Sequence, residues 1–271
     1  MAVGKALQSV PTALARNPLI VALFAVFGLV QSVQVVTQQL SPIVGLALSA
    51  LTILLYVLGM PFVQGGLIAM ADESLRGRTT LGTFLRAGKS NYLSLFGATL
   101  IVFLVNALIG IAVVAAVLTG AVSLAAVESG SGLLVAGAVA LLAAVLYLAF
   151  SFFVQFYGQE IVLNDASAVA GLKGSASLVR RNLLSAAGYL VVSFVGGGAL
   201  GAVIGVASTL LLPQPSLHGT LNQAAVPGLV GYIVVTVLVT ALLGSILLVF
   251  SVAFYREIHG GRSRTSEAAG V

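Results

Sequence analysis

Six long apolar runs, separated by short polar stretches, dominate the sequence. Each run is long enough to cross a hydrocarbon layer of about 30 Å as an α-helix, which takes about 20 residues. A membrane β-barrel would instead need segments of about ten residues that alternate polar and apolar, and these runs are continuous. The pattern therefore predicts an all-α, polytopic membrane protein with six transmembrane helices, at approximately residues 18–36, 43–70, 93–120, 133–156, 183–212 and 227–254.

The composition agrees with this interpretation. Charged residues make up 7% of the 271 residues and apolar ones 59%, whereas a soluble domain averages roughly 25% charged residues. Too few charges are present to build a soluble surface, and too many apolar residues for a disordered chain. The chain has no cysteine, which excludes disulfides, thiolate metal sites and thiol catalysis.

The 12 basic residues all fall in segments that share one side of the predicted membrane. They precede the first apolar run or follow the second, fourth and sixth, and the opposite loops hold no Lys or Arg. The positive-inside rule then places both termini in the cytoplasm, with the protein in the plasma or inner cell membrane. The net charge of +5 is accordingly interpreted as topology and as affinity for anionic lipid headgroups, with no nucleic-acid partner.

A short motif recurs along the chain. Each odd-numbered run opens with a basic residue closely followed by Asn, and each even-numbered run ends near a Glu. The motif comprises Arg16, Asn17, Glu73, Lys89, Asn91, Glu160, Arg181, Asn182 and Glu257. We interpret the chain as one six-span domain of three helical hairpins, with repeats at 5–73, 79–160 and 167–257 and a disordered cytoplasmic tail at 260–271.

The glutamates of the motif stand at helix C-termini, where a carboxylate opposes the helix dipole. We therefore expect each to have a compensating partner, most simply the basic residue that opens a neighbouring repeat. The alternative is a cytoplasmic ring of three carboxylates that guards a pathway.

Amphipathic segments precede the odd-numbered runs and predict cytoplasmic interfacial helices. The first of two between the repeats has Thr79 or Thr80 as its cap, and the second has Asp165 or Ser167. The N-terminal segment is a weaker example, interrupted by Pro11. Glycines within these segments lower helix propensity, so the segments are expected to fold only against the bilayer or the helix bundle.

Two of these stretches carry a resemblance to known proteins. They are NDASAVAGLKGSASLVRRNLLSAAGYLVVSF at 164–194 and ADESLRGRTTLGTFLRAGKSNYLSLFGATLIVF at 71–103. The first resembles poorly characterised prokaryotic membrane proteins that include the membrane domain attached to some glycerophosphodiester phosphodiesterases. Both resemble related archaeal proteins of unknown function. The resemblance implies a six-helix membrane fold and no established activity. The phosphodiesterase activity is not carried over, because the soluble catalytic barrel of that enzyme is missing.

Polar side chains within the runs are amides and hydroxyls, without a charge near the predicted midplane. Candidates for a polar pathway are Gln31, Gln34, Gln64, Asn106 and Gln155. Hydrogen bonding between helices is the simpler interpretation of these residues, and a path for a neutral solute is the other. Pro61 predicts a kink that leaves a backbone carbonyl in need of a partner. A groove of Gly197, Gly201 and Gly205 predicts close helix packing, within the fold or between subunits.

Catalytic and metal motifs are weak throughout. The stretch GTFLRAGKS at 82–90 has the wrong spacing for a nucleotide-binding loop and follows no buried strand. His218 and His259 are predicted on opposite faces of the membrane, so they cannot share a metal. We expect no enzyme activity, no metal and no cofactor. The leading hypothesis is a membrane-organising or partner-binding component, with a membrane protein or a second copy as partner; the alternative is a small permease or channel for an uncharged or lipid-like solute.

Overall fold

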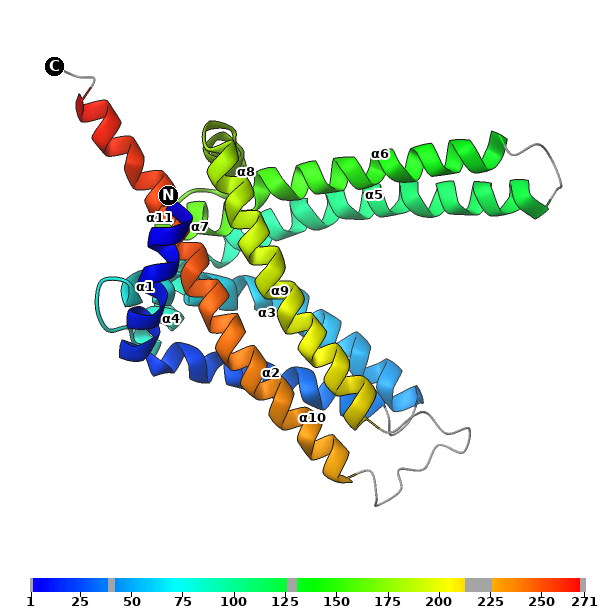
Figure 1. Cartoon of the computed structure of the whole chain (residues 1–271), viewed down its shortest axis with the longest axis horizontal. Coiled ribbons are helices and arrows are strands. Elements are labelled where there is room, and N and C mark those ends of the chain that lie inside the picture. Colours follow the sequence, from blue (N-terminus) through cyan, green and yellow to red (C-terminus); the bar gives the residue numbers. More distant parts are fainter. Residues whose placement is uncertain (1, 39–41, 126–130, 213–225, 269–271) are drawn as a thin grey trace. The chain divides into compact units, whose positions relative to one another are not determined.

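The computed structural model describes residues 2–38, 42–125, 131–212 and 226–268, and side chains at 2–32, 49, 51–119, 134–212 and 226–260. All regular structure in these ranges is helical, so the predicted all-α class is confirmed. A π-helical turn at Thr240–Gly244 separates the last two helices. The helices (Figure 1) are α1 (Ala2–Arg16), α2 (Pro18–Gln38), α3 (Pro42–Ser74), α4 (Leu81–Ser90), α5 (Tyr92–Ala125), α6 (Ser131–Val154), α7 (Tyr157–Leu163), α8 (Ala168–Arg181), α9 (Leu183–Leu211), α10 (Val226–Val239) and α11 (Ser245–Ala268).

The number of helical stretches that could cross a membrane agrees with the sequence pattern. Five stretches in the described residues are long and apolar enough, and a sixth is reached when α1 is joined to Pro18–Ser32 of α2, a pair bent by 89°. The prediction of six spans matches the upper count. The five are Leu51–Ser74, Tyr92–Thr119, Leu134–Leu163, Leu183–Leu211 and Val226–Gly260.

The contacts within the chain divide it into two compact units, and the single six-span domain with its three repeats stays a prediction. The first unit comprises Met1–Tyr92 and Asn182–Val271, and the second comprises Leu93–Arg181. The second unit holds nearly all of α5 with α6, α7 and α8; helix α8 packs on α6 and α7, and the start of α5 packs on α7. The other unit holds the first predicted repeat, α4, and the third repeat from Asn182 onward.

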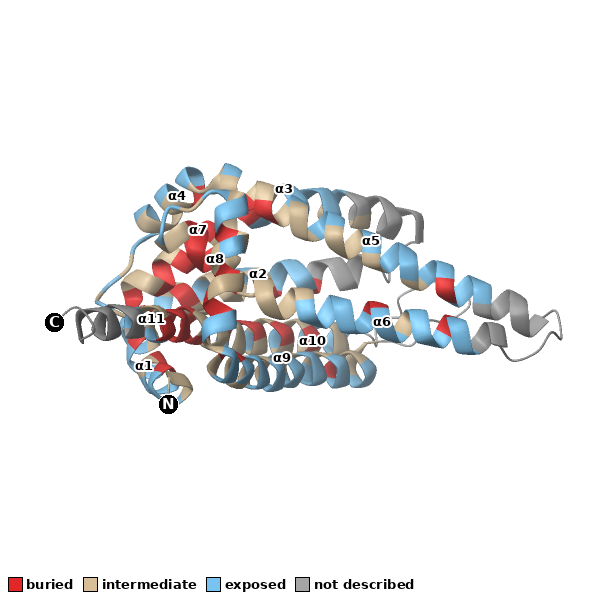
Figure 2. Cartoon of the chain, turned by 90° about the horizontal axis from the view of Figure 1, so that it is seen from above, coloured by how far each residue is buried: buried red, intermediate tan, exposed pale blue. Residues whose placement is uncertain are grey.

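The densest packing in the first unit surrounds α11 (Figure 2). Phe250 and Phe254 on this helix are fully buried. The ring of Tyr189 on α9 stacks on both, with centroid distances of 5.4 and 4.9 Å. Helix α1 packs on α11 as well, and its buried side chains are Ala6, Val10 and Ala13. The amphipathic N-terminal segment thus buries its apolar face against protein.

Helix α4 is held on α3 by two reciprocal contacts between a glycine and a phenylalanine. A Cβ atom on Gly66 of α3 would overlap the ring of Phe84 on α4. A Cβ atom on Gly88 of α4 would come 2.7 Å from the carbonyl oxygen of Phe62 on α3. The two phenylalanine rings meet edge to face, with centroids 5.6 Å apart. These glycines therefore allow close approach at the expense of helix propensity.

In the second unit, a glycine likewise allows two helices to approach closely. Gly171 of α8 lies against Ile161 of α7, where a side chain on the glycine would overlap it. Ile161 is fully buried with Leu95 and Ala98 of α5. Helix α8 is thereby fixed on α7 and on the start of α5, as expected for a segment that folds only against the bundle.

Ser175 of α8 holds the break between α6 and α7. Its hydroxyl donates to the carbonyl oxygen of Phe153 at 2.8 Å and accepts from the backbone N–H of Phe156 at 3.0 Å. Both groups lie where the helical hydrogen bonds are interrupted. The predicted fourth run, 133–156, therefore ends in a separate short helix rather than in a coil.

The elements follow the same order three times along the chain. A short helix, an Asn and two long helical segments occur as α1–Asn17–α2–α3, α4–Asn91–α5–α6/α7 and α8–Asn182–α9–α10/α11. Each short helix packs on the end of a returning helix: α4 on α3, α8 on α6 and α7, and α1 on α11. Within each hairpin the long helices run in opposite directions, as α5 and α6 illustrate (Figure 1).

Helix α11 continues through Ala268, and residues 269–271 lie outside the described range. The disordered cytoplasmic tail at 260–271 stays a prediction. Adding residues to a helix that is already formed costs far less than starting one, and Arg, Glu and Ala in this segment are good helix formers. The Gly-Gly pair at 260–261 therefore does not end the helix.

Candidate functional site

Asn17, at the corner between α1 and α2, is 3% exposed and hydrogen-bonded through both side-chain atoms. Its Nδ2 donates to the carbonyl oxygens of Ala13 and Gly77, each at 2.9 Å. Its Oδ1 accepts from the backbone N–H of Thr79 at 2.7 Å. An amide can donate twice and accept at the same time. Asn17 thereby joins the first corner of the chain to the connection between α3 and α4.

Glu73, at the end of α3, is hydrogen-bonded to the same connection between α3 and α4. Its Oε2 accepts a hydrogen bond of 2.7 Å from the hydroxyl of Thr79. The expected basic partner is replaced here by a hydroxyl, since no ion pair of Glu73 occurs among the described residues. Thr80 then caps α4 by accepting from the backbone N–H of Thr83 at 3.3 Å, which fulfils one of the two predicted capping choices.

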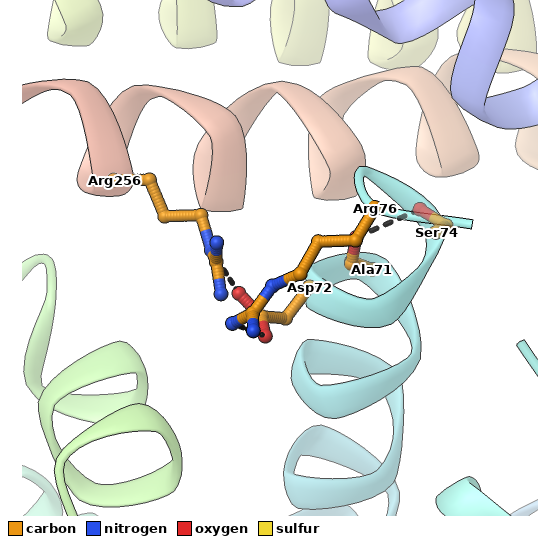
Figure 3. Close-up of polar contacts among 5 residues, drawn as sticks. All are labelled: Ala71, Asp72, Ser74, Arg76 and Arg256. Carbon is orange, nitrogen blue, oxygen red and sulfur yellow. Dashed lines mark hydrogen bonds and ion pairs between the residues drawn. The ribbon is translucent and has the colours of Figure 1, made fainter.

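Two arginine side chains form ion pairs with Asp72 rather than with Glu73 (Figure 3). Its carboxylate pairs with Arg76, four residues later and just beyond the end of α3, at 3.0 Å, and with the Nε of Arg256 on α11. The Asp72 side chain is 14% exposed. The cation thus comes from the end of the third repeat rather than from a basic residue that opens a neighbouring repeat, and it pairs with the residue before the motif glutamate.

The asparagines of the motif are structural, whereas its cations face outward. Asn91 donates to the carbonyl oxygen of Ala87 at 3.0 Å, which repeats the spacing of four residues between Asn17 and Ala13. Asn182 is half-buried at the end of α8. The cationic side chains are exposed and have no hydrogen bond or ion pair with another described residue; they are Arg16, Lys89 and Arg181.

The three motif glutamates have different surroundings. Glu160 is 8% exposed, accepts from the Nδ2 of Asn164 at 2.8 Å and lies against Gly174 of α8. Glu257 is exposed, without a side-chain partner among the described residues. Glu73 is half-buried. The carboxylates are therefore not equivalent, although their positions recur in the sequence.

The predicted polar pathway is divided between the two units. Gln31 is exposed on α2 and Gln64 half-buried on α3, while the side chain of Gln34 lies outside the described residues. In the second unit, the Oδ1 of Asn106 and both amide atoms of Gln155 are buried without a hydrogen-bond partner among the described residues. Asn106 and Gln155 thus carry buried amide atoms with unused hydrogen-bonding capacity.

A family model described as a domain of unknown function, DUF7847, matches residues 1–258. The chain belongs to the DUF7847 family. The matched region includes all three copies of the recurring motif, so this family spans the whole of the three-hairpin arrangement. No curated protein and no solved structure matches the chain. The family match carries no link to glycerophosphodiester phosphodiesterases or to archaeal proteins.

In this DUF7847 chain, the ion pair between Asp72 and Arg256 is the contact of the site that was not predicted from the sequence. The signal was present, because Asp72 precedes Glu73 and Arg256 precedes Glu257 at corresponding places in the repeats. Opposite charges at equivalent repeat positions could have suggested a contact between repeats. Within the described residues no three His, Asp or Glu side chains gather as metal ligands would.

Proposed function

We propose that this protein is a non-enzymatic, multi-pass component of the cell membrane, with both termini in the cytoplasm, that binds a membrane partner through α9. A second copy of the chain is the partner that the chemistry of this helix favours. The exposed cations at the ends of the spans are proposed to meet anionic lipid headgroups, without a nucleic-acid role.

The observation that carries the proposal is an open glycine face on α9. Gly197, Gly201 and Gly205 lie four residues apart and are exposed. A Cβ atom added at any of them would meet nothing within 4 Å. In an apolar helix this spacing forms a flat groove that lets another helix approach closely.

Beside other glycines of the same unit, the space that a side chain would take is occupied by another helix of the chain. Gly28 of α2 lies against the backbone of Val237 on α10, and Gly196 of α9 lies against Leu247 on α11. Glycine thus brings helices together within this unit, whereas no described helix packs against the glycine face of α9. A glycine face is self-complementary, so two copies can pair through identical surfaces, as in most symmetric dimers.

The test uses two full-length copies with different affinity tags, expressed together and extracted with their native lipid. We expect capture of one tag to recover the other, and Gly201→Leu to reduce this recovery about tenfold, because the bulky side chain blocks close approach. Gly110→Leu is the matched control, since Gly110 on α5 is also exposed and open but has no glycine one turn away.

A second readout covers other partners. A photoreactive residue at Gly198, beside the glycine face, should crosslink to a second copy or to another membrane protein in native membranes. The proposal fails if the two tags do not associate and this residue crosslinks to lipid alone.

The alternative function, a small permease or channel for an uncharged solute, is favoured by Asn106 and Gln155. Their buried amide atoms lack partners in the described chain, and such atoms normally find a partner or a polar ligand. Uptake of glycerol into proteoliposomes tests this role. Transport that is lost with Asn106→Leu and kept with Ala107→Leu would support a pathway; wild-type liposomes as tight as protein-free ones would exclude it for this solute.

A further inference from the structure

The outer face of α8 carries a basic groove in the second unit. The groove has a volume of about 440 Å³ and is lined by Lys173, Ala176, Ser177, Arg180 and Arg181. It therefore brings three cations to one side of a helix of 14 residues.

No part of the described chain neutralises these cations. Lys173, Arg180 and Arg181 are exposed, and their side chains make no ion pair or hydrogen bond with another described residue. Lys173 and Arg180 stand two turns apart, about 10 Å along the helix axis. The carboxylate of Glu160 lies against Gly174 on the packed side of α8 and is bonded to Asn164. The charge of the groove is thus left for an external anion.

Contacts on the packed side of α8, opposite the groove, hold the helix in place. Gly171 and Gly174 let α7 approach α8 closely, and the Ser175 hydroxyl is bonded to two backbone groups at the break between α6 and α7. These contacts fix the rotation of α8 about its axis. A ligand therefore meets cations whose positions are already set, which lowers the entropy lost on binding.

The floor of the groove is small and polar enough for a phosphate group. Ala176 and Ser177 lie between Lys173 and Arg180, and the Ser177 hydroxyl has no hydrogen bond with another described residue. An arginine guanidinium presents parallel N–H donors that match two phosphate oxygens, and lysine adds a point charge.

We propose that this groove binds the phosphate of an anionic phospholipid headgroup. A helix long and apolar enough to span a membrane begins at Leu183, two residues after Arg181. Arg181 therefore stands where the chain enters the membrane, at the level of phospholipid headgroups, which favours a lipid over a free phosphate. The inference rests on the headgroup contact proposed above and assigns selective retention of the lipid to this groove rather than to all exposed cations; it does not depend on partner binding through α9.

The test uses the full-length protein in phosphatidylcholine nanodiscs with a minor fraction of phosphatidylglycerol. Native mass spectrometry counts the phosphatidylglycerol molecules retained after dilution into neutral detergent. We expect the triple variant Lys173→Gln, Arg180→Gln, Arg181→Gln to lower this retention about tenfold or more. Ser177→Leu, which fills the floor and keeps every charge, should also lower it.

The matched control removes the same charge elsewhere. Lys5→Gln, Arg78→Gln, Lys89→Gln changes three exposed cations without side-chain partners and should alter retention by less than about twofold. Equal losses in both triple variants, or no loss in the groove variant, would overturn the proposal. Titration of inorganic phosphate separates the sources: groove-dependent binding of phosphate without retention of phosphatidylglycerol would overturn the lipid assignment.

Discussion

The hydroxyl of Tyr92 donates a hydrogen bond of 3.0 Å to the backbone carbonyl oxygen of Leu58. Leu58 lies three residues before Pro61 in α3, where the proline removes an N–H and displaces preceding carbonyls from the helical pattern. The sequence predicts a carbonyl in need of a partner here, that of Val57, four residues before Pro61. The first residue of α5 bonds the neighbouring carbonyl in the same turn, that of Leu58.

Removing this hydroxyl should weaken the first unit. We expect Tyr92→Phe to lower the free energy of unfolding by about 1 kcal/mol, because a carbonyl within an apolar helix loses a donor. Thermal unfolding in a mild detergent measures the effect. Tyr147→Phe is the control, since Tyr147 is 47% exposed and has no hydrogen bond with another described residue; equal shifts for both variants would contradict the role of Tyr92.

The Asp72–Arg256 pair should couple the two repeats of the first unit. We expect Asp72→Asn and Arg256→Gln each to cost about 1–3 kcal/mol, because each leaves a partly buried charge without its partner. The double variant should lose less than the sum of the two single losses, and this difference measures the pair.

Glu257→Gln is the neighbouring control for this cycle. Glu257 is exposed and unpaired among the described residues, so its substitution should change stability by less than about 0.5 kcal/mol. Strict additivity of the Asp72 and Arg256 variants would mean that the contact contributes nothing.

Two glycines of α4 should respond in opposite ways to alanine. Gly88→Ala should destabilise the protein by about 1–3 kcal/mol, since its Cβ would come 2.7 Å from a backbone oxygen that cannot swing aside. Gly82→Ala should be neutral or stabilise by up to about 1 kcal/mol, because its nearest contact is an ordinary 3.4 Å and alanine favours the helix. Unfolding of both variants in detergent gives the comparison; a stabilising Gly88→Ala would contradict the packing of α4 on α3.

Orientation can be tested directly, because the chain contains no cysteine. Single cysteines at Ser129 and Ser216 should react with a membrane-impermeant maleimide added to intact cells, and one at Ser263 should react only after lysis. The first two positions lie outside the described residues, so the prediction rests on the placement of basic residues alone. The opposite labelling pattern would reverse the topology.

Local pattern was sufficient for the long helices. The apolar run at 183–212 corresponds to α9 at Leu183–Leu211, because the length of continuous apolar sequence decides the extent of a membrane helix. Thr80 was likewise a readable cap, since capping depends on adjacent residues.

Features that depend on distant residues could not be read in this way. The separation of α7 from α6 relies on Ser175, 19 residues after Phe156. The pairing of a cation with Asp72 rather than with Glu73 depends on Arg256, which is 184 residues away from Asp72. A charge pattern shows that a partner is needed, whereas the choice between adjacent carboxylates is made by the geometry of two helices in contact.

The packing of α1 on α11 has a consequence for biosynthesis. Helices α4 and α8 follow their packing partners α3 and α7 in the chain, so each partner has been made before the short helix is synthesised. Helix α1 precedes all the other described helices, and its partner α11 follows all of them. The apolar face of α1 therefore needs other cover, at the membrane surface or on a chaperone, until α11 has been made. Docking of α1 on α11 thus requires that every intervening helix has already been synthesised.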